Sequence, residues 1–179
     1  MSTEHSRAAK SSIVAMWIFV LSDAVGFAAL VSTLQALRSD RSAFAAAELP
    51  VPSTGLWAGT GLLALLSILL LVADMGRRGA QLRRGLYGLA AIVAILFLLL
   101  QGQELYTLWQ DVDARQSGAG QSYLALASVH GAHVLAGALA LVPAVIRPRS
   151  KHGALALYWH AVGAMWLAIL VFLLFGGSV

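Results

Sequence analysis

The sequence predicts an all-α, polytopic membrane protein built as a bundle of five transmembrane helices. Five apolar stretches are each long enough to cross roughly 30 Å of bilayer hydrocarbon, which takes about 20 helical residues. The composition agrees, with 59% hydrophobic and 11% charged residues and a mean hydropathy of +0.79. The apolar residues run continuously and do not alternate with polar ones, which favours helices over a barrel of strands. The predicted helices cover about residues 13–37, 55–73, 86–108, 123–146 and 154–175.

The distribution of basic residues predicts the orientation in the membrane. Most of the 12 lysines and arginines gather on one side of the five helices, and the positive-inside rule places that side in the cytoplasm. The N-terminus is therefore expected in the cytoplasm and the C-terminus in the periplasm. This asymmetry accounts for the net charge of +4 without a nucleic-acid partner. The basic residues expected inside are Arg7, Lys10, Arg77, Arg78, Arg83, Arg84, Arg147, Arg149 and Lys151.

The first predicted helix, residues 13–37, carries a carboxylate near its middle. Its apolar run is longer than the roughly 7–15 residues of a signal peptide, so a retained helix is expected, and residues 1–179 are expected to form a single transmembrane domain. An ionisable group in hydrocarbon is costly unless it faces protein or water. Asp23 is therefore either a protonatable site or helix anchor, or a protonated carboxyl paired quietly inside the bundle.

The third and fourth predicted helices carry polar groups near their outer ends. The tight connection Arg77–Arg84 makes the second and third helices antiparallel neighbours, and a short loop makes the third and fourth adjacent. Glu104 and His130 then lie at comparable depth, so a Glu–His pair between helices is feasible. His130 and His133 share a helix face, a spacing that suits either a metal site or two hydrogen bonds to a neighbour. Haem ligation by one or two histidines is a further alternative.

The last predicted helix contains an aromatic stretch near its inner end. Trp159 and His160 follow a tyrosine, and this composition is typical of an anchor in the interfacial belt. On the fourth helix, Gly131 and Gly137 are small residues that permit a partner helix to approach closely.

The composition excludes several kinds of chemistry. The chain has no cysteine, which rules out disulfides, thiolate metal sites and cysteine nucleophiles. Its intramembrane polar residues are too sparse for an evident catalytic centre, which favours an accessory subunit. Two rival interpretations remain open: a small membrane haem-binding redox protein that uses His130, His133 and His160, and a proton-coupled carrier that uses Asp23 and Glu104. The depth of His160, near the opposite surface from His130, argues against the first.

Four segments together resemble subunit III of the haem-copper respiratory oxidases, in the five-helix form typical of quinol oxidases. The first is WIFVLSDAVGF, from Trp17 to Phe27. The second is a Gln-x-x-Glu pattern, and the third a His-Gly-x-His-Val-x-x-Gly pattern. The fourth is Tyr-Trp-His followed by a tryptophan six residues later. The positions matched in the last three segments are Gln101, Glu104, His130, Gly131, His133, Val134, Gly137, Tyr158, Trp159, His160 and Trp166.

The resemblance implies a role for the chain. Subunit III of that family carries no redox cofactor; it packs against catalytic subunit I, which holds the haems and copper, and it binds structural phospholipid. Subunit II, a larger respiratory supercomplex and the bacterial cytoplasmic (inner) membrane are expected surroundings. Asp23 matches the family's carbodiimide-reactive carboxylate, and Glu104 and His133 match residues near its lipid cleft. Short relatives associated with nitric-oxide reductases share the pattern, so that host complex stays an alternative.

Overall fold

The computed structural model describes residues 2–39, 54–75, 79–113, 118–147 and 153–175 of the 179-residue chain. Within these residues the structure is helical and contains no strand, and five helices are long and apolar enough to cross a membrane. The predicted fold class is therefore confirmed. The helices are α1 (Ser2–Ser39), α3 (Thr54–Asp74), α4 (Ala80–Gln110), α6 (Gly118–Ile146) and α7 (Gly153–Phe175).

Three helices begin several residues earlier than the apolar runs predicted. α1 begins at Ser2, α4 at Ala80 and α6 at Gly118. Hydropathy finds the part of a helix that suits hydrocarbon, whereas backbone hydrogen bonding continues through polar residues beyond it. Arg83 illustrates this in the first turns of α4. It is buried, and its Nε donates to the Ala73 carbonyl at 3.3 Å, which ties the start of α4 to the end of α3.

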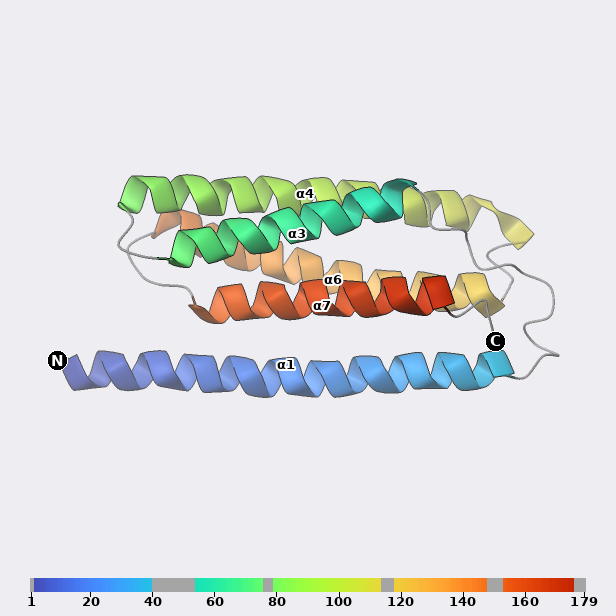
Figure 1. The fold of residues 1–179 in the computed structure, drawn as a ribbon, viewed down its shortest axis with the longest axis horizontal. Coiled ribbons are helices and arrows are strands. Elements are labelled where there is room, and N and C mark those ends of the chain that lie inside the picture. Colours follow the sequence, from blue (N-terminus) through green and yellow to red (C-terminus); the bar gives the residue numbers. More distant parts are fainter. Residues whose placement is uncertain (1, 40–53, 76–78, 114–117, 148–152, 176–179) are drawn as a thin grey trace.

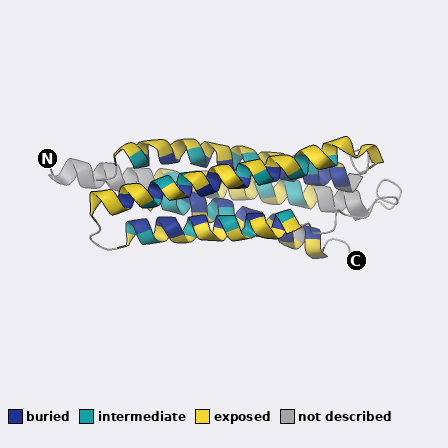
Figure 2. Ribbon diagram, turned by 90° about the horizontal axis from the view of Figure 1, so that it is seen from above, coloured by how far each residue is buried: buried dark blue, intermediate teal, exposed yellow. Residues whose placement is uncertain are grey.

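Four of the helices form a closed bundle (Figure 1). α3 packs against α4, α4 against α6, α6 against α7, and α7 against α3, so the predicted adjacency of the second and third helices and of the third and fourth is confirmed. Buried residues lie where these helices face one another, and exposed residues lie on their outer sides (Figure 2). The core contains Leu66, Ala94, Phe97, Leu126, Val134, Leu141, Trp159, Val162 and Trp166.

α1 lies along one edge of the bundle, where its contacts with the other described helices are with α6 and α7 (Figure 1). None of its described side chains between Val14 and Thr33 is buried. Val14, Ile18, Leu21 and Val25 are each at least half exposed. These apolar side chains suit lipid or another protein as their surroundings, because water would disfavour so large an apolar surface. α1 therefore depends on a small number of contacts for its position.

Candidate functional site

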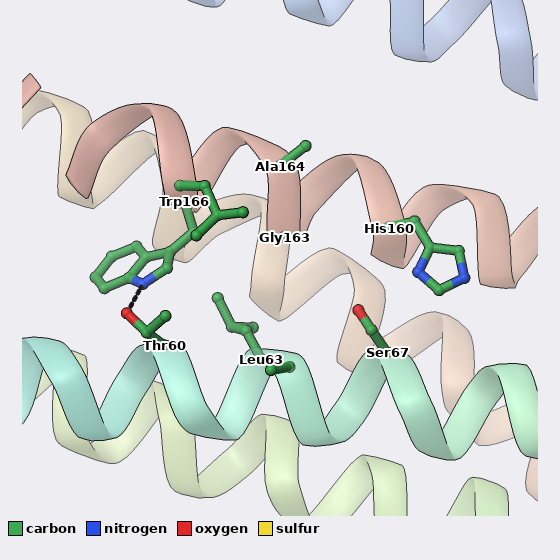
Figure 3. Close-up of a pocket in the computed structure, with 9 residues that line it drawn as sticks. Thr60, Leu63, Ser67, His160, Gly163, Ala164 and Trp166 are labelled. Carbon is green, nitrogen blue, oxygen red and sulfur yellow. Dashed lines mark hydrogen bonds between the residues drawn. The ribbon is translucent and has the colours of Figure 1, made fainter. Parts of the chain in front are cut away.

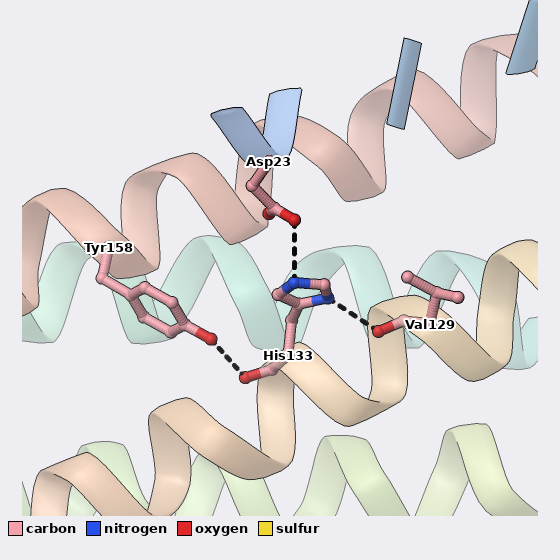
Figure 4. Close-up of polar contacts among 4 residues, drawn as sticks. All are labelled: Asp23, Val129, His133 and Tyr158. Atoms are coloured by element: carbon pink, nitrogen blue, oxygen red, sulfur yellow. Dashed lines mark hydrogen bonds and ion pairs between the residues drawn. The ribbon is translucent and has the colours of Figure 1, made fainter. Parts of the chain in front are cut away.

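A carboxylate–imidazole pair joins α1 to α6 (Figure 4). Asp23 Oδ1 lies 3.0 Å from Nε2 of His133, and both side chains are about one-fifth exposed, at 21% and 20%. Nδ1 of His133 lies 2.8 Å from the carbonyl oxygen of Val129, one turn earlier on α6. Asp23 Oδ2 is buried without a hydrogen-bond partner among the described residues. The predicted helix-anchoring interpretation of Asp23 thus has a specific partner.

The geometry limits where protons can lie in this pair. A carbonyl oxygen only accepts, so a hydrogen bond to Val129 requires a proton on Nδ1 of His133. A hydrogen bond between Nε2 of His133 and Oδ1 of Asp23, which lie 3.0 Å apart, requires one further proton on one of these two atoms. Wherever it resides, the pair carries no net charge, since it is either a neutral acid with a neutral imidazole or a carboxylate with an imidazolium. A net-neutral, hydrogen-bonded pair is the least costly way to keep two ionisable groups inside a membrane.

Tyr158 on α7 adds a third helix to the site. Its hydroxyl donates to the backbone carbonyl of His133 at 2.7 Å (Figure 4). The contact is possible because α6 has a glycine where α7 crosses it. A Cβ on Gly137 would lie 2.7 Å from Tyr158 Cε1 and 2.7 Å from Trp159 Cζ2. The close approach predicted for Gly137 is confirmed. At Gly131 no atom of the described chain lies within 4 Å of such a Cβ, so no helix of this chain uses that position for a close approach.

His130 points into the bundle core, away from the Asp23 pair. It is 1% exposed, and neither ring nitrogen has a hydrogen-bond partner among the described residues. Its ring packs edge-on against Phe97 at 5.7 Å and tilted against Trp166 at 5.0 Å. The feasible Glu104–His130 pair is therefore not formed, because an aromatic cluster surrounds His130.

Glu104 and Gln101 contact two other elements. The Glu104 carboxylate lies against Gly55 in the first turn of α3, where a negative charge complements the helix N-terminus. Gln101 is buried and its Nε2 donates to the Tyr123 hydroxyl at 3.4 Å, which links α4 to α6. The hydrogen bond between Gln101 and Tyr123 was not among the contacts predicted from the sequence. The sequence shows a polar residue on each of two adjacent helices, but it does not show that these two residues meet.

The aromatic stretch of α7 is divided between core and surface. Trp159 is 1% exposed and Tyr158 is buried, so the interfacial-belt interpretation is wrong for both, because they pack into the crossing with α6. His160 is exposed on the outer surface. Trp166 is buried and donates its Nε1 proton to Thr60 Oγ1 at 2.9 Å, whereas Trp17 on α1 is 49% exposed.

The three intramembrane histidines face three different environments. His130 lies in an aromatic core, His133 meets Asp23, and His160 faces outward. They do not converge on one ligand, which weighs against the haem-binding rival. Across the part of the chain that the structure describes, no group of three or more histidine, cysteine, aspartate or glutamate residues could hold a metal ion.

Fold and site together define a multi-pass membrane protein whose described intramembrane polar contacts join its own helices. The chain is similar to cytochrome c oxidase subunit 3 of Corynebacterium diphtheriae, with 30% identity over 50% of this chain and 48% of that protein. It is 28% identical to cytochrome c oxidase subunit 3 of Spodoptera frugiperda over 59% of this chain and 76% of that protein. It is 22% identical to cytochrome bo(3) ubiquinol oxidase subunit 3 of Buchnera aphidicola over 99% of this chain and 93% of that protein.

The similarities cover only part of some relatives, and they are not accompanied by a family match. The chain spans about half the length of the corynebacterial relative, 48%. No protein-family model matches the chain. The relatives are named as subunits of oxidase complexes, which supports an accessory oxidase subunit as the general class of this protein.

Proposed function

We propose that this chain is an accessory, cofactor-free subunit III of a proton-pumping haem-copper terminal oxidase in a bacterial cytoplasmic membrane. Residues 1–179 would form a single transmembrane domain with a cytoplasmic N-terminus and a periplasmic C-terminus. The chain would pack against catalytic subunit I beside subunit II, and the haems and copper would belong to the partner. The observation that carries the proposal is the similarity to a quinol-oxidase subunit 3 over 99% of this chain and 93% of the relative.

The polar contacts of the chain support an accessory role. Asp23 and His133 satisfy each other across two helices, Gln101 bonds Tyr123, and Trp166 bonds a threonine. Groups used in this way orient helices and leave no evident set for a reaction. Transfer of one proton between Asp23 and His133 leaves the net charge of the pair unchanged, which suits a position beside a proton-pumping partner.

A groove between α1 and α7 supports the phospholipid part of the proposal. Its volume is about 470 Å³, and apart from one serine its lining is apolar. The lining residues are Val20, Ala24, Phe27, Ala28, Val31, Ser32, Ala161, Ala164, Met165 and Ala168. An acyl chain fits such a surface because it makes dispersion contacts and needs no hydrogen bonds.

The test is purification of the tagged chain from its native membranes in a mild detergent. The purified complex should show haem absorbance in reduced-minus-oxidised spectra and should consume oxygen. After the subunits are separated, this chain should retain no haem. Haem retained by the isolated chain would contradict the cofactor-free assignment, and recovery without any haem-containing partner would contradict membership in an oxidase. Reduction of nitric oxide in place of oxygen would assign the other host complex.

A further inference from the structure

A second groove runs between α3 and α7 on the outer surface of the bundle (Figure 3). Its volume is about 230 Å³. Ser67 lies on the α3 side, and His160 and Gly163 lie on the α7 side. Gly163 has no side chain to fill the groove. The nearest atom to a Cβ built at this position would be Ser67 Oγ, at 3.7 Å. The complete lining is Thr60, Leu63, Ala64, Ser67, His160, Gly163, Ala164, Trp166 and Leu167.

In a bundle whose helices α3 and α7 span the membrane, the groove would lie below the headgroups. Ser67 precedes the end of α3 at Asp74 by seven residues, and His160 follows the start of α7 at Gly153 by seven. At 1.5 Å per residue, both side chains start about 10 Å from their helix ends, and Gly163 about 15 Å. This depth reaches the middle of a hydrocarbon layer of roughly 30 Å.

Two polar side chains in this groove lack partners. Among the described residues, neither the Ser67 hydroxyl nor the His160 imidazole makes a hydrogen bond, although His160 is exposed. Thr60, farther along the groove, is different because its hydroxyl donates to Leu56 O and accepts from Trp166. Acyl chains offer no hydrogen bonds, so an ionisable side chain turned toward lipid at this depth indicates a missing partner.

The dimensions of the groove favour a side chain from another helix over a free ligand. About 230 Å³ is below the roughly 300–1,000 Å³ of typical small-molecule pockets. The small residues Ala64, Gly163 and Ala164 allow a second helix backbone to come close, as in transmembrane helix pairs generally. A hydroxyl and an imidazole can each donate and accept, so a side chain that does both, such as an amide or a protonated carboxyl, is complementary to them.

We propose that the α3–α7 groove is the docking seat for a transmembrane helix of the catalytic subunit. That helix would insert an amide or carboxyl side chain over Gly163 and hydrogen-bond it to Ser67 and His160. The inference rests on the proposed function, because it takes the catalytic subunit of the oxidase as the partner. It adds which face of the chain docks and which chemistry the partner presents.

The first test places a photo-activated cross-linking amino acid at Leu167, which lines the groove. A matched control position is Leu139 on α6, which is also exposed but lies outside the groove. Irradiation of native membranes should join position 167 to the catalytic subunit, identified by mass spectrometry, and position 139 should give no such product. Adducts of position 167 with lipid alone or with a second copy of this chain would overturn the inference.

The second test compares two glycine-to-leucine substitutions. Gly163→Leu fills the groove, and Gly88→Leu adds the same side chain to open space on α4. We expect Gly163→Leu to lower the haem recovered per tagged chain about fivefold, and Gly88→Leu to change it less than about twofold. His160→Leu should resemble Gly163→Leu, whereas His160→Gln should retain recovery because glutamine still donates and accepts.

The outcomes separate the two proposals. If the wild-type chain and Gly163→Leu recover equal amounts of haem, the docking seat is overturned and the proposed function is left intact. Absence of haem already in the wild-type preparation overturns the proposed function, and the docking seat with it.

Discussion

Gly137→Ala is expected to separate α6 from α7 and to destabilise the bundle. The added Cβ would lie 2.7 Å from ring carbons of Tyr158 and Trp159, against at least 3.4 Å for an ordinary contact, so one helix must move by about 0.7 Å. Overpacking of this kind costs about 1–3 kcal/mol. Alanine in place of a helical glycine returns about 1 kcal/mol, so the net loss of unfolding free energy is about 0–2 kcal/mol.

Gly131→Ala on the same helix is the matched control. It gains the same helix propensity, and no atom lies within 4 Å of its added Cβ. The difference between the two variants therefore isolates the contact at Gly137 and should be about 1–3 kcal/mol. The measurement is reversible unfolding in mixed detergent micelles, followed by circular dichroism and by tryptophan fluorescence, to which the buried Trp159 contributes. Equal stability of the two alanine variants would refute the packing argument.

Four further substitutions test the polar contacts. Asp23→Asn should keep α1 attached and leave co-purification with the catalytic subunit unchanged. Asp23→Leu should weaken this association by about 1–3 kcal/mol, because an imidazole nitrogen of His133 loses its partner. Equal recovery of the catalytic subunit with both variants would remove the anchoring role of Asp23. Gly55→Ala should cost less than about 1 kcal/mol in unfolding, since the Glu104 carboxylate that it meets ends a flexible side chain. Trp166→Phe should lower the unfolding free energy by about 1 kcal/mol, because it loses the 2.9 Å bond to Thr60; an unchanged value would mean that the bond contributes nothing.

The sequence predicted the helices well because hydrocarbon imposes a single strong requirement on them. A continuous apolar run must become a helix, and a short loop must join neighbours. Each of the five predicted spans lies within or coincides with an observed helix, from 13–37 within Ser2–Ser39 to 154–175 within Gly153–Phe175. The ends differ where polar residues extend a helix beyond the apolar run.

The pairing of the polar residues was harder to predict, because depth and direction are separate quantities. Counting along the chain placed Glu104 and His130 at similar depth. Three residues along a helix turn it by about 300°, which leaves His130 and His133 about 60° apart around α6. That angle suffices for one ring to enter the core beside Phe97 and for the other to meet Asp23. The sequence contains no separate signal for this rotation.

The position of α1 follows from the same physical constraint. Between Val14 and Thr33 this helix has no buried side chain, and lipid solvates its apolar surface as well as α6 or α7 would. Burial therefore gives little preference for one rotation or register of α1 over another. The Asp23–His133 contact does favour one register, because a shift of one turn would leave a carboxyl and an imidazole unpaired in hydrocarbon. This polar pair thus favours one position of α1, and with it the shape of the apolar groove against α7.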